Sequence, residues 1–211
     1  MSVQDSRPLG RPRDPEIRAK VLLAAQRVYI RTGLAGFTFE AIAREAAVGK
    51  PAIYRRWKSS SDLLDDVLRS HVLVPGDAAR GHIRGELWEI ALRTLRLTHS
   101  EQGAFVLRLS AERGLQPELF DQYFERLRNV IHFENRALVT AAIERGELAE
   151  DCDADILIQA ITGAALVSTL MSFTVSPEAD LEAAEQFCRR LVDQVLRGAL
   201  PSRSFDRSPR G

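Results

Sequence analysis

Cysteine is scarce in this chain of 211 residues, which contains only Cys152 and Cys188. Two cysteines so far apart do not form a disulfide framework, and neither belongs to a CxxC motif or to a cluster with histidine that would hold zinc. We therefore expect no metal site. A reducing, cytoplasmic environment is the simplest interpretation of this cysteine usage.

The motifs that usually accompany catalysis are also lacking. The sequence contains no glycine-rich phosphate loop, no GxSxG, no HExxH and no arrangement of cysteine with histidine that would make a nucleophile. Residues 151–155 (DCDAD) begin like a calcium loop but lack its glycine and its closing glutamate, so helix capping explains them better. These absences predict a protein that is not an enzyme, has no catalytic residues and uses no cofactor.

One apolar run is long enough to raise the question of a membrane span. Residues 156–175 contain a single strongly polar side chain, Gln159. Serines and threonines lower the hydrophobicity of this run, however, and its flanks are acidic, without the lysine or arginine that would anchor a span. We predict a helix buried on both sides and no membrane partner. The N-terminal residues also lack the apolar core of a signal peptide.

The charges balance over the whole chain but not along it. The formal net charge is zero. Residues 1–70 hold 13 basic and 8 acidic side chains, whereas residues 71–211 hold 16 basic and 21 acidic ones. A basic head on an acidic body is typical of a protein whose N-terminal part meets phosphate groups, although chance segregation is an alternative.

The hydrophobic pattern predicts an all-α chain of about nine helices. No segment alternates apolar and polar residues as a half-buried strand does. Gly33 is expected to end the first helix, and Asp153 is expected to cap the apolar one. The predicted helices cover residues 15–32 and 39–46, a short piece from residue 50, a segment from about residue 61, then 79–100, 102–113, 117–145, 154–174, and a last helix that opens at Ser176-Pro177 and ends near residue 196.

Residues 38–57 carry the strongest functional signal. Phe39, Ile42 and Ala43 fall on one face of a first short helix that Thr38 can cap. Residues 47–49 make a turn, and the second helix starts with a proline in its first turn, where proline is tolerated. Ile53 and Trp57 point inward, which leaves outward Lys50, Ala52, Tyr54, Arg55 and Arg56. Such a basic face suits the DNA major groove, while an ordinary helical hairpin with a solvated basic face is the alternative.

This stretch resembles the helix-turn-helix of the TetR family of bacterial transcription regulators. The resemblance rests on an ordered set: the arm GRPR (10–13), an amphipathic first helix, TFEAIA (38–43) and KPAIYRRW (50–57). It covers about the first 70 residues closely and the remainder only in helical layout. It implies an N-terminal three-helix helix-turn-helix head and a C-terminal helical domain for ligand binding and dimerisation. We expect a flexible basic arm over 1–14, the DNA-binding domain over 15–74, the second domain over 75–198 and a disordered tail over 199–211.

The resemblance assigns the second helix of the motif to the major groove. Arg55 can donate two hydrogen bonds to guanine, Ala52 can touch a thymine methyl group, and Tyr54 and Lys58 are expected on phosphates. Arg56 is either a phosphate contact or a solvated side chain. The expected DNA-binding residues are Arg11, Arg13, Thr38, Lys50, Pro51, Ala52, Tyr54, Arg55, Arg56 and Lys58. Gly49 and Ser60 depart from the family pattern, in which serine and lysine are frequent at these positions.

The resemblance also implies a small-molecule effector inside the acidic body, whose identity the residues do not reveal. Candidate pocket residues are the larger aromatic or ionisable side chains, although such a side chain is more often a core or surface residue than part of a pocket. They are Trp88, His99, Phe105, Phe120, Tyr123 and His132.

The last two helices carry more apolar surface than one small body can cover. Two such helices from each subunit can form a four-helix interface, as in proteins of this family, although both can also be monomer core. The expected contact residues are Ile161, Ala164, Ala165, Leu181, Ala184, Phe187, Cys188, Leu191 and Val195. A two-fold dimer presents two recognition helices to successive major grooves, which predicts an inverted-repeat operator.

The predicted function is that of a ligand-responsive transcriptional regulator. In this interpretation a cytoplasmic homodimer represses by binding an operator in double-stranded DNA, and a small-molecule effector releases it. The alternative is a DNA-binding protein without a small-molecule ligand that acts through a protein partner. The long second domain favours the first interpretation, since a minimal DNA-binding protein needs no such domain.

Overall fold

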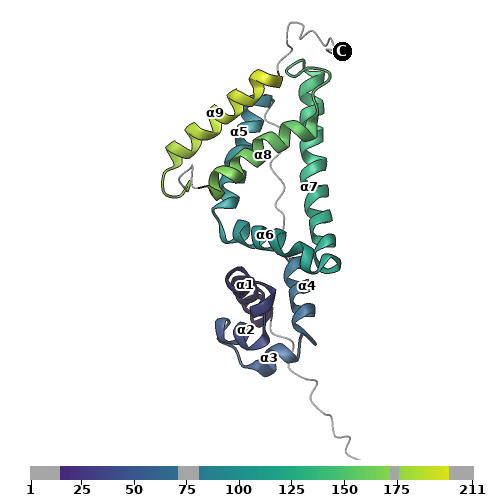
Figure 1. Cartoon of the computed structure of the whole chain (residues 1–211), viewed down its shortest axis with the longest axis vertical. Helices are drawn as coiled ribbons and strands as arrows, with labels where there is room; N and C mark the ends of the chain where they lie inside the picture. Colours follow the sequence, from purple (N-terminus) through teal and green to yellow (C-terminus); the bar gives the residue numbers. More distant parts are fainter. Residues whose placement is uncertain (1–14, 71–80, 172–175, 200–211) are drawn as a thin grey trace, which may run out of the picture. The chain divides into compact units, whose positions relative to one another are not determined.

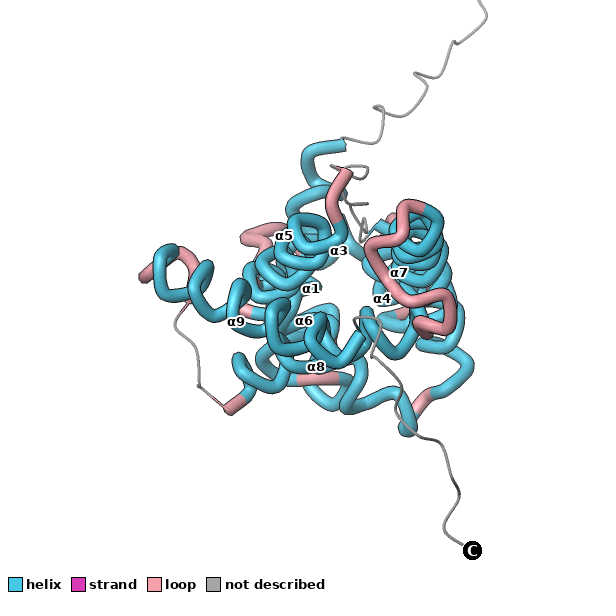
Figure 2. Tube along the Cα trace, turned by 90° about the horizontal axis from the view of Figure 1, so that it is seen from above, coloured by secondary structure: helices cyan, strands magenta, loops and turns pink. Residues whose placement is uncertain are grey.

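The computed structural model describes residues 15–70, 81–171 and 176–199. Within these ranges it contains nine α-helices and two short 3₁₀ helices, without a strand, as predicted (Figures 1 and 2). The chain divides into two compact units, residues 1–71 and 72–211. The expected arm and most of the expected tail lie outside the described residues, as do Arg11 and Arg13. None of the helices described is both long and apolar enough to cross a membrane.

The first unit is a small helical bundle built on its first helix. It contains α1 (Pro15–Thr32), η1 (Leu34–Gly36), α2 (Phe39–Glu45), α3 (Lys50–Tyr54) and α4 (Ser60–Ser70). The α1 helix packs against α2 and α4, and α2 packs against α3. Gly33 ends α1 as predicted, because its φ of 61° is left-handed and its N–H reaches the Tyr29 carbonyl at 2.8 Å.

The second unit is built around a central helix, α5. It contains α5 (Ile83–Thr98), α6 (Glu101–Glu112), η2 (Arg113–Leu115), α7 (Pro117–Glu144), α8 (Ala154–Leu170) and α9 (Leu181–Ala199). The α5 helix packs most extensively against α8 and α9. Leu87 and Leu95 of α5, Ile161 of α8 and Cys188 of α9 are fully buried in one shared core. Asp153 caps α8 as predicted, accepting from the N–H of Asp155 at 2.9 Å.

The start of the last helix differs from the prediction. Residues 177–179 form a turn, in which the N–H of Ala179 donates to the Ser176 carbonyl at 2.9 Å. The α9 helix begins only at Leu181, because the Asp180 side chain accepts from the N–H of Ala183 at 2.9 Å and makes a better cap. The α8 helix likewise ends at Leu170, four residues before the predicted end.

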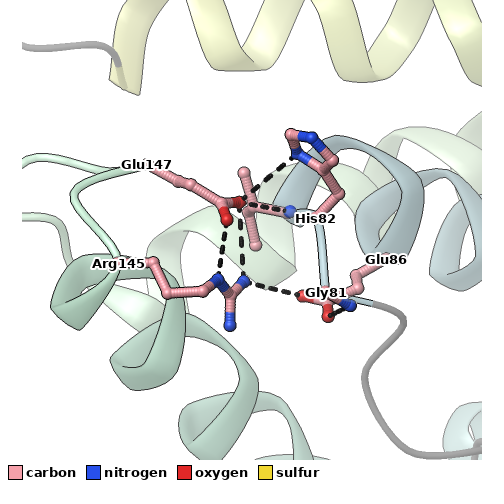
Figure 3. Close-up of polar contacts among 6 residues, drawn as sticks. Gly81, His82, Glu86, Arg145 and Glu147 are labelled. Atoms are coloured by element: carbon pink, nitrogen blue, oxygen red, sulfur yellow. Dashed lines mark hydrogen bonds and ion pairs between the residues drawn. The ribbon is translucent and has the colours of Figure 1, made fainter.

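A polar network joins the start of α5 to the end of α7 (Figure 3). The Glu147 carboxylate accepts from the backbone N–H of Ile83 at 2.6 Å and from Nε of Arg145 at 2.6 Å. Arg145 also approaches the buried Glu86 carboxylate at 3.7 Å, and the N–H of Gly81 donates to Glu86 at 3.2 Å. Hydrogen bonding to Arg145 lowers the pKa of Glu147. The network satisfies N–H groups at the start of α5, where the side chain of the capping residue makes no such bond.

Candidate DNA-binding interface

Local hydrogen bonds fix the two short helices of the first unit and the turn between them. Thr38 caps α2 by accepting from the N–H of Ala41 at 3.2 Å, as predicted. The turn closes when the N–H of Val48 reaches the Ala43 carbonyl at 3.0 Å. Gly49 then precedes α3, and its carbonyl accepts from the N–H of Ala52 at 2.9 Å. The arrangement is a helix-turn-helix.

The conformation of the turn was not evident from its composition. Glycine is the residue that most readily adopts positive φ, yet Gly49 has an extended backbone with φ −67°. Ala47 carries the positive φ, 52°, as the single such non-glycine residue in the described ranges. An alanine in this region is strained. Packing of α2 against α3 therefore holds the turn in a conformation that its local sequence disfavours.

A buried tryptophan anchors the segment that follows α3. Trp57 donates from its indole nitrogen to Oδ2 of Asp66 at 3.0 Å. The same carboxylate binds Arg18 of α1 at 2.5 Å, so it links three segments of the unit. Sequence reasoning missed Asp66. The available signal was that a buried indole N–H needs an acceptor, and that Asp66 lies among the apolar residues of α4.

The outer face of the motif carries accessible polar and cationic groups. Tyr54 is 55% exposed, and its ring packs edge-to-face on Phe39 with centroids 4.9 Å apart. Lys50 forms an ion pair with Glu40 at 2.9 Å, and this contact lowers the pKa of Glu40 and raises that of Lys50. Because both partners are exposed, the pair contributes little stability and its lysine can exchange to a phosphate. Arg55 is exposed nearby.

Other members of the predicted DNA-binding set occupy the following positions. Lys58 and Pro51 are exposed. The Thr38 oxygen is engaged as a cap, although its hydroxyl hydrogen takes no part in that bond.

Two residues expected on the outer face lie elsewhere. Ala52 is buried, with 9% of its surface exposed. The prediction that its methyl group faces the DNA major groove is therefore wrong. Arg56 is half-buried and donates to the Ala52 carbonyl at 3.1 Å, so its guanidinium is neither freely solvated nor pointed away from the helix. Ala52 and Ile53 are the buried residues of α3, so Ala52 belongs to the inward face of this short helix.

The predicted pocket residues occupy different environments in the second unit. Phe105, Phe120 and Tyr123 are buried, and burial raises the pKa of Tyr123 to about 12. Trp88 instead lines a groove between α5 and α9, and His99 caps the other end of α5. The side chain of His132 lies outside the described residues.

The predicted dimer residues divide into two groups. Ile161, Ala165, Ala184 and Cys188 are buried in the core of their own subunit, so the expectation that they contact a partner is wrong. The remainder retain accessible surface. They are Ala164, Leu181, Phe187, Leu191 and Val195.

The fold and the site define a class of protein: a helix-turn-helix DNA-binding unit joined to a larger helical unit. Two family models cover most of the chain. The model described as "Bacterial regulatory proteins, tetR family" matches residues 21–67, and that described as "Tetracyclin repressor-like, C-terminal domain" matches residues 77–195. The chain therefore belongs to the TetR family of transcriptional regulators.

Similar proteins agree with this assignment. A protein of Bacillus subtilis (strain 168), named as the uncharacterized HTH-type transcriptional regulator YdeS, is 25% identical over 193 residues, covering 90% of this chain and 92% of that protein. The crystal structure of a TetR transcriptional regulator from Agrobacterium tumefaciens has a TM-score of 0.63 at 20% identity, covering 87% of this chain and 94% of the other. MexZ, described as a key repressor responsible for antibiotic resistance in Pseudomonas aeruginosa, gives 0.64 at 20% identity, covering 86% and 96%. These likenesses show a common fold.

Proposed function

We propose that the protein is a repressor that binds an inverted-repeat operator as a homodimer and is released by a small-molecule effector. The observation that carries the proposal is the accessible basic face around α3, in a chain whose α8 helix leaves an apolar stripe uncovered. The first feature supports operator binding, and the second supports two-fold pairing.

Operator binding would use the exposed side of the helix-turn-helix. Arg55 is accessible at the end of α3 and can donate to a guanine edge, while Lys58 just beyond is placed for a phosphate. Tyr54 is accessible beside them, and Lys50 is held only by an exposed ion pair. Phosphate contacts fix the register of the helix, and base contacts supply sequence preference.

Two substitutions separate these roles. Arg55→Ala should weaken operator binding by about 1–3 kcal/mol and relax sequence preference, because a base contact is lost. Lys58→Ala should weaken operator and unrelated DNA equally and should reduce the salt slope of log K by about one. Footprinting and fluorescence anisotropy across a salt series would measure both effects. If Arg55→Ala changes neither affinity nor preference, the assignment of the recognition face is wrong.

Pairing would use the outer stripe of α8. Ile156, Val167, Leu170 and Met171 are exposed apolar residues, and their spacing places them on one face of the helix. Gly163 lies on the same stripe, and a Cβ built there would have no neighbour within 4 Å. A contiguous apolar stripe on a protein surface typically marks an interface, and small residues let a second helix approach closely. This stripe replaces the four buried residues of the original expectation.

A charge in the stripe tests the interface. Val167→Glu should raise the dimer dissociation constant by about a hundredfold, because two carboxylates would meet near the two-fold axis without water. Sedimentation equilibrium at micromolar concentration would show the shift toward monomer. Leu115→Glu is the control, since Leu115 is also an exposed apolar residue but lies in η2, away from the stripe. Equal behaviour of both variants, or a wild-type monomer, would contradict the proposal.

Repression and release by an effector require that the protein change its operator affinity. MexZ, which shares the fold, is described as a repressor, and the long second unit gives room for an effector to alter the operator-binding state. Footprinting of the DNA upstream of the gene for this protein should protect an inverted repeat. Deleting the gene should raise transcription from the protected promoter, whereas a fall in transcription would identify an activator.

A further inference from the structure

A groove of about 570 Å³ lies between the first turns of α5 and the middle of α9. Its size is in the range in which proteins bind small ligands. The floor is apolar and includes Gly85, Trp88 and Val192. It lies entirely within the second unit, and nothing in the helix-turn-helix contributes to it.

The floor of the groove includes a glycine, Gly85, at a helical position where a residue with a side chain would be more stable. Gly85 lies in the first turn of α5, and glycine favours a helix less than alanine does. A Cβ built at this position has no neighbour within 4 Å, so a side chain here would not clash with any described residue. Trp88 beside it packs on the core, and its indole Nε1 has no hydrogen-bond acceptor among the described residues. The indole nitrogen is itself buried, so the groove offers part of the half-buried Trp88 ring and not its donor.

The rim of the groove carries two arginines, Arg84 and Arg189, and one carboxylate, Asp193. His82 also lines the rim, and its Nδ1 lies 3.8 Å from the Glu147 carboxylate. Asp193 is already paired with Arg84. The Arg189 guanidinium lies 5.9 Å from the Trp88 ring centroid.

The guanidinium of Arg189 is free to take a further partner. Its ion pair with Glu185 measures 3.2 Å, and 67% of the arginine side chain is exposed. An exposed pair one helical turn apart holds its partners weakly. Guanidinium also has five N–H donors, so it can bind a second carboxylate without losing the first.

We propose that this groove binds an aromatic carboxylate. The ring lies on Trp88 above Gly85, and the carboxylate pairs with Arg189, with Arg84 as the second cation at the rim. An aromatic ring matches the flat indole surface, and a carboxylate matches the N–H donors that the exposed Arg189 guanidinium can still offer. The inference does not depend on operator binding, because the ligand is recognised by the free protein.

Nuclear magnetic resonance of the full-length protein without DNA tests the site directly. The chain has two tryptophans, so its indole region contains two N–H signals, which Trp57→Phe assigns. Titration with 1-naphthoate should shift the Trp88 indole signal with saturation. The Trp57 signal should stay in place, because Trp57 lies in the other unit and donates to Asp66. The uncharged 1-naphthalenemethanol and the cationic 1-naphthylmethylamine should bind at least about tenfold more weakly.

Variants of the groove distinguish this site from adventitious binding. Gly85→Leu should abolish the shift by filling the floor while preserving the fold, since leucine favours a helix more than glycine does. Arg189→Gln should weaken binding about tenfold, whereas Arg190→Gln, which changes an exposed arginine outside the groove, should not. Binding that survives Gly85→Leu, equal loss in both arginine variants, or equal affinity for the three naphthyl compounds would each overturn the proposal.

Discussion

Replacing Gly103 with alanine tests how closely α6 begins beside the end of α5. A Cβ built at Gly103 would lie 2.1 Å from the carbonyl oxygen of Leu97 and 2.8 Å from its carbonyl carbon. The obstacle is backbone, so no side-chain rotation can relieve it. The start of α6 would have to move by roughly 1 Å to reach ordinary contact distance.

That movement would disturb the hydrogen bonds of the same junction. The Leu97 carbonyl accepts from the N–H of Ser100 at 3.0 Å and from its hydroxyl at 2.7 Å. The Ser100 hydroxyl oxygen in turn accepts from the N–H of Gly103 at 3.2 Å, which caps α6. Overpacking costs about 1–3 kcal/mol and a weakened cap about 1 kcal/mol, while alanine gains about 1 kcal/mol in helix propensity. We expect a net loss of about 1–3 kcal/mol in the free energy of unfolding.

The same substitution at another helical glycine provides the control. Gly85 in α5 has no atom within 4 Å of a built Cβ, so Gly85→Ala should raise the free energy of unfolding by about 1 kcal/mol. Urea unfolding followed by far-UV circular dichroism, at one fixed protein concentration, would compare the two midpoints. The expected signs are opposite. If Gly103→Ala stabilises the protein as much as Gly85→Ala does, the close approach of α6 to Leu97 is refuted.

Two further perturbations probe local contacts. Glu147 has a pKa below its ordinary value of 4.5, so it stabilises the folded state above that pH, and the contribution disappears as the pH falls through its folded pKa. The wild type should therefore lose its stability advantage over Glu147→Gln between about pH 5 and 3 in urea titrations, and a constant difference would argue against the ion pair with Arg145. Thr38→Ala removes the cap of α2 and should lower the free energy of unfolding by about 1 kcal/mol, with Thr38→Ser as the tolerated control. Equal loss in both Thr38 variants would show that the hydroxyl is not the cap.

Several features of the fold could be predicted from the sequence because they depend on residues that are close together in the chain. The regular spacing of apolar residues indicated the helices, because residues three to four positions apart lie on the same face of a helix in any tertiary context. Gly33, Thr38 and Asp153 were recognisable as helix ends, since capping involves residues within a few positions of each other. The helix-turn-helix was recognisable for the same reason. Its two helices, their turn and its outward basic groups all fall within residues 38–57.

Other features depended on packing between distant segments. The α8 helix is apolar on nearly every side, so its composition does not distinguish the buried Ile161 and Ala165 from the exposed Val167. The role of Asp66 depends on Arg18 and Trp57, which come from other segments. The predicted pocket residues shared only their chemistry, and the structure separates Trp88 at the α5–α9 groove from the buried Phe105.

The sequence by itself determined the all-helical class, the DNA-binding motif and most helix ends, because these depend on short-range spacing and backbone capping. The tertiary structure alone decided which faces are buried, which residues remain accessible on α3 and α8, and where a groove opens. Those properties depend on which helices meet, and a helix with several apolar faces does not encode that choice locally.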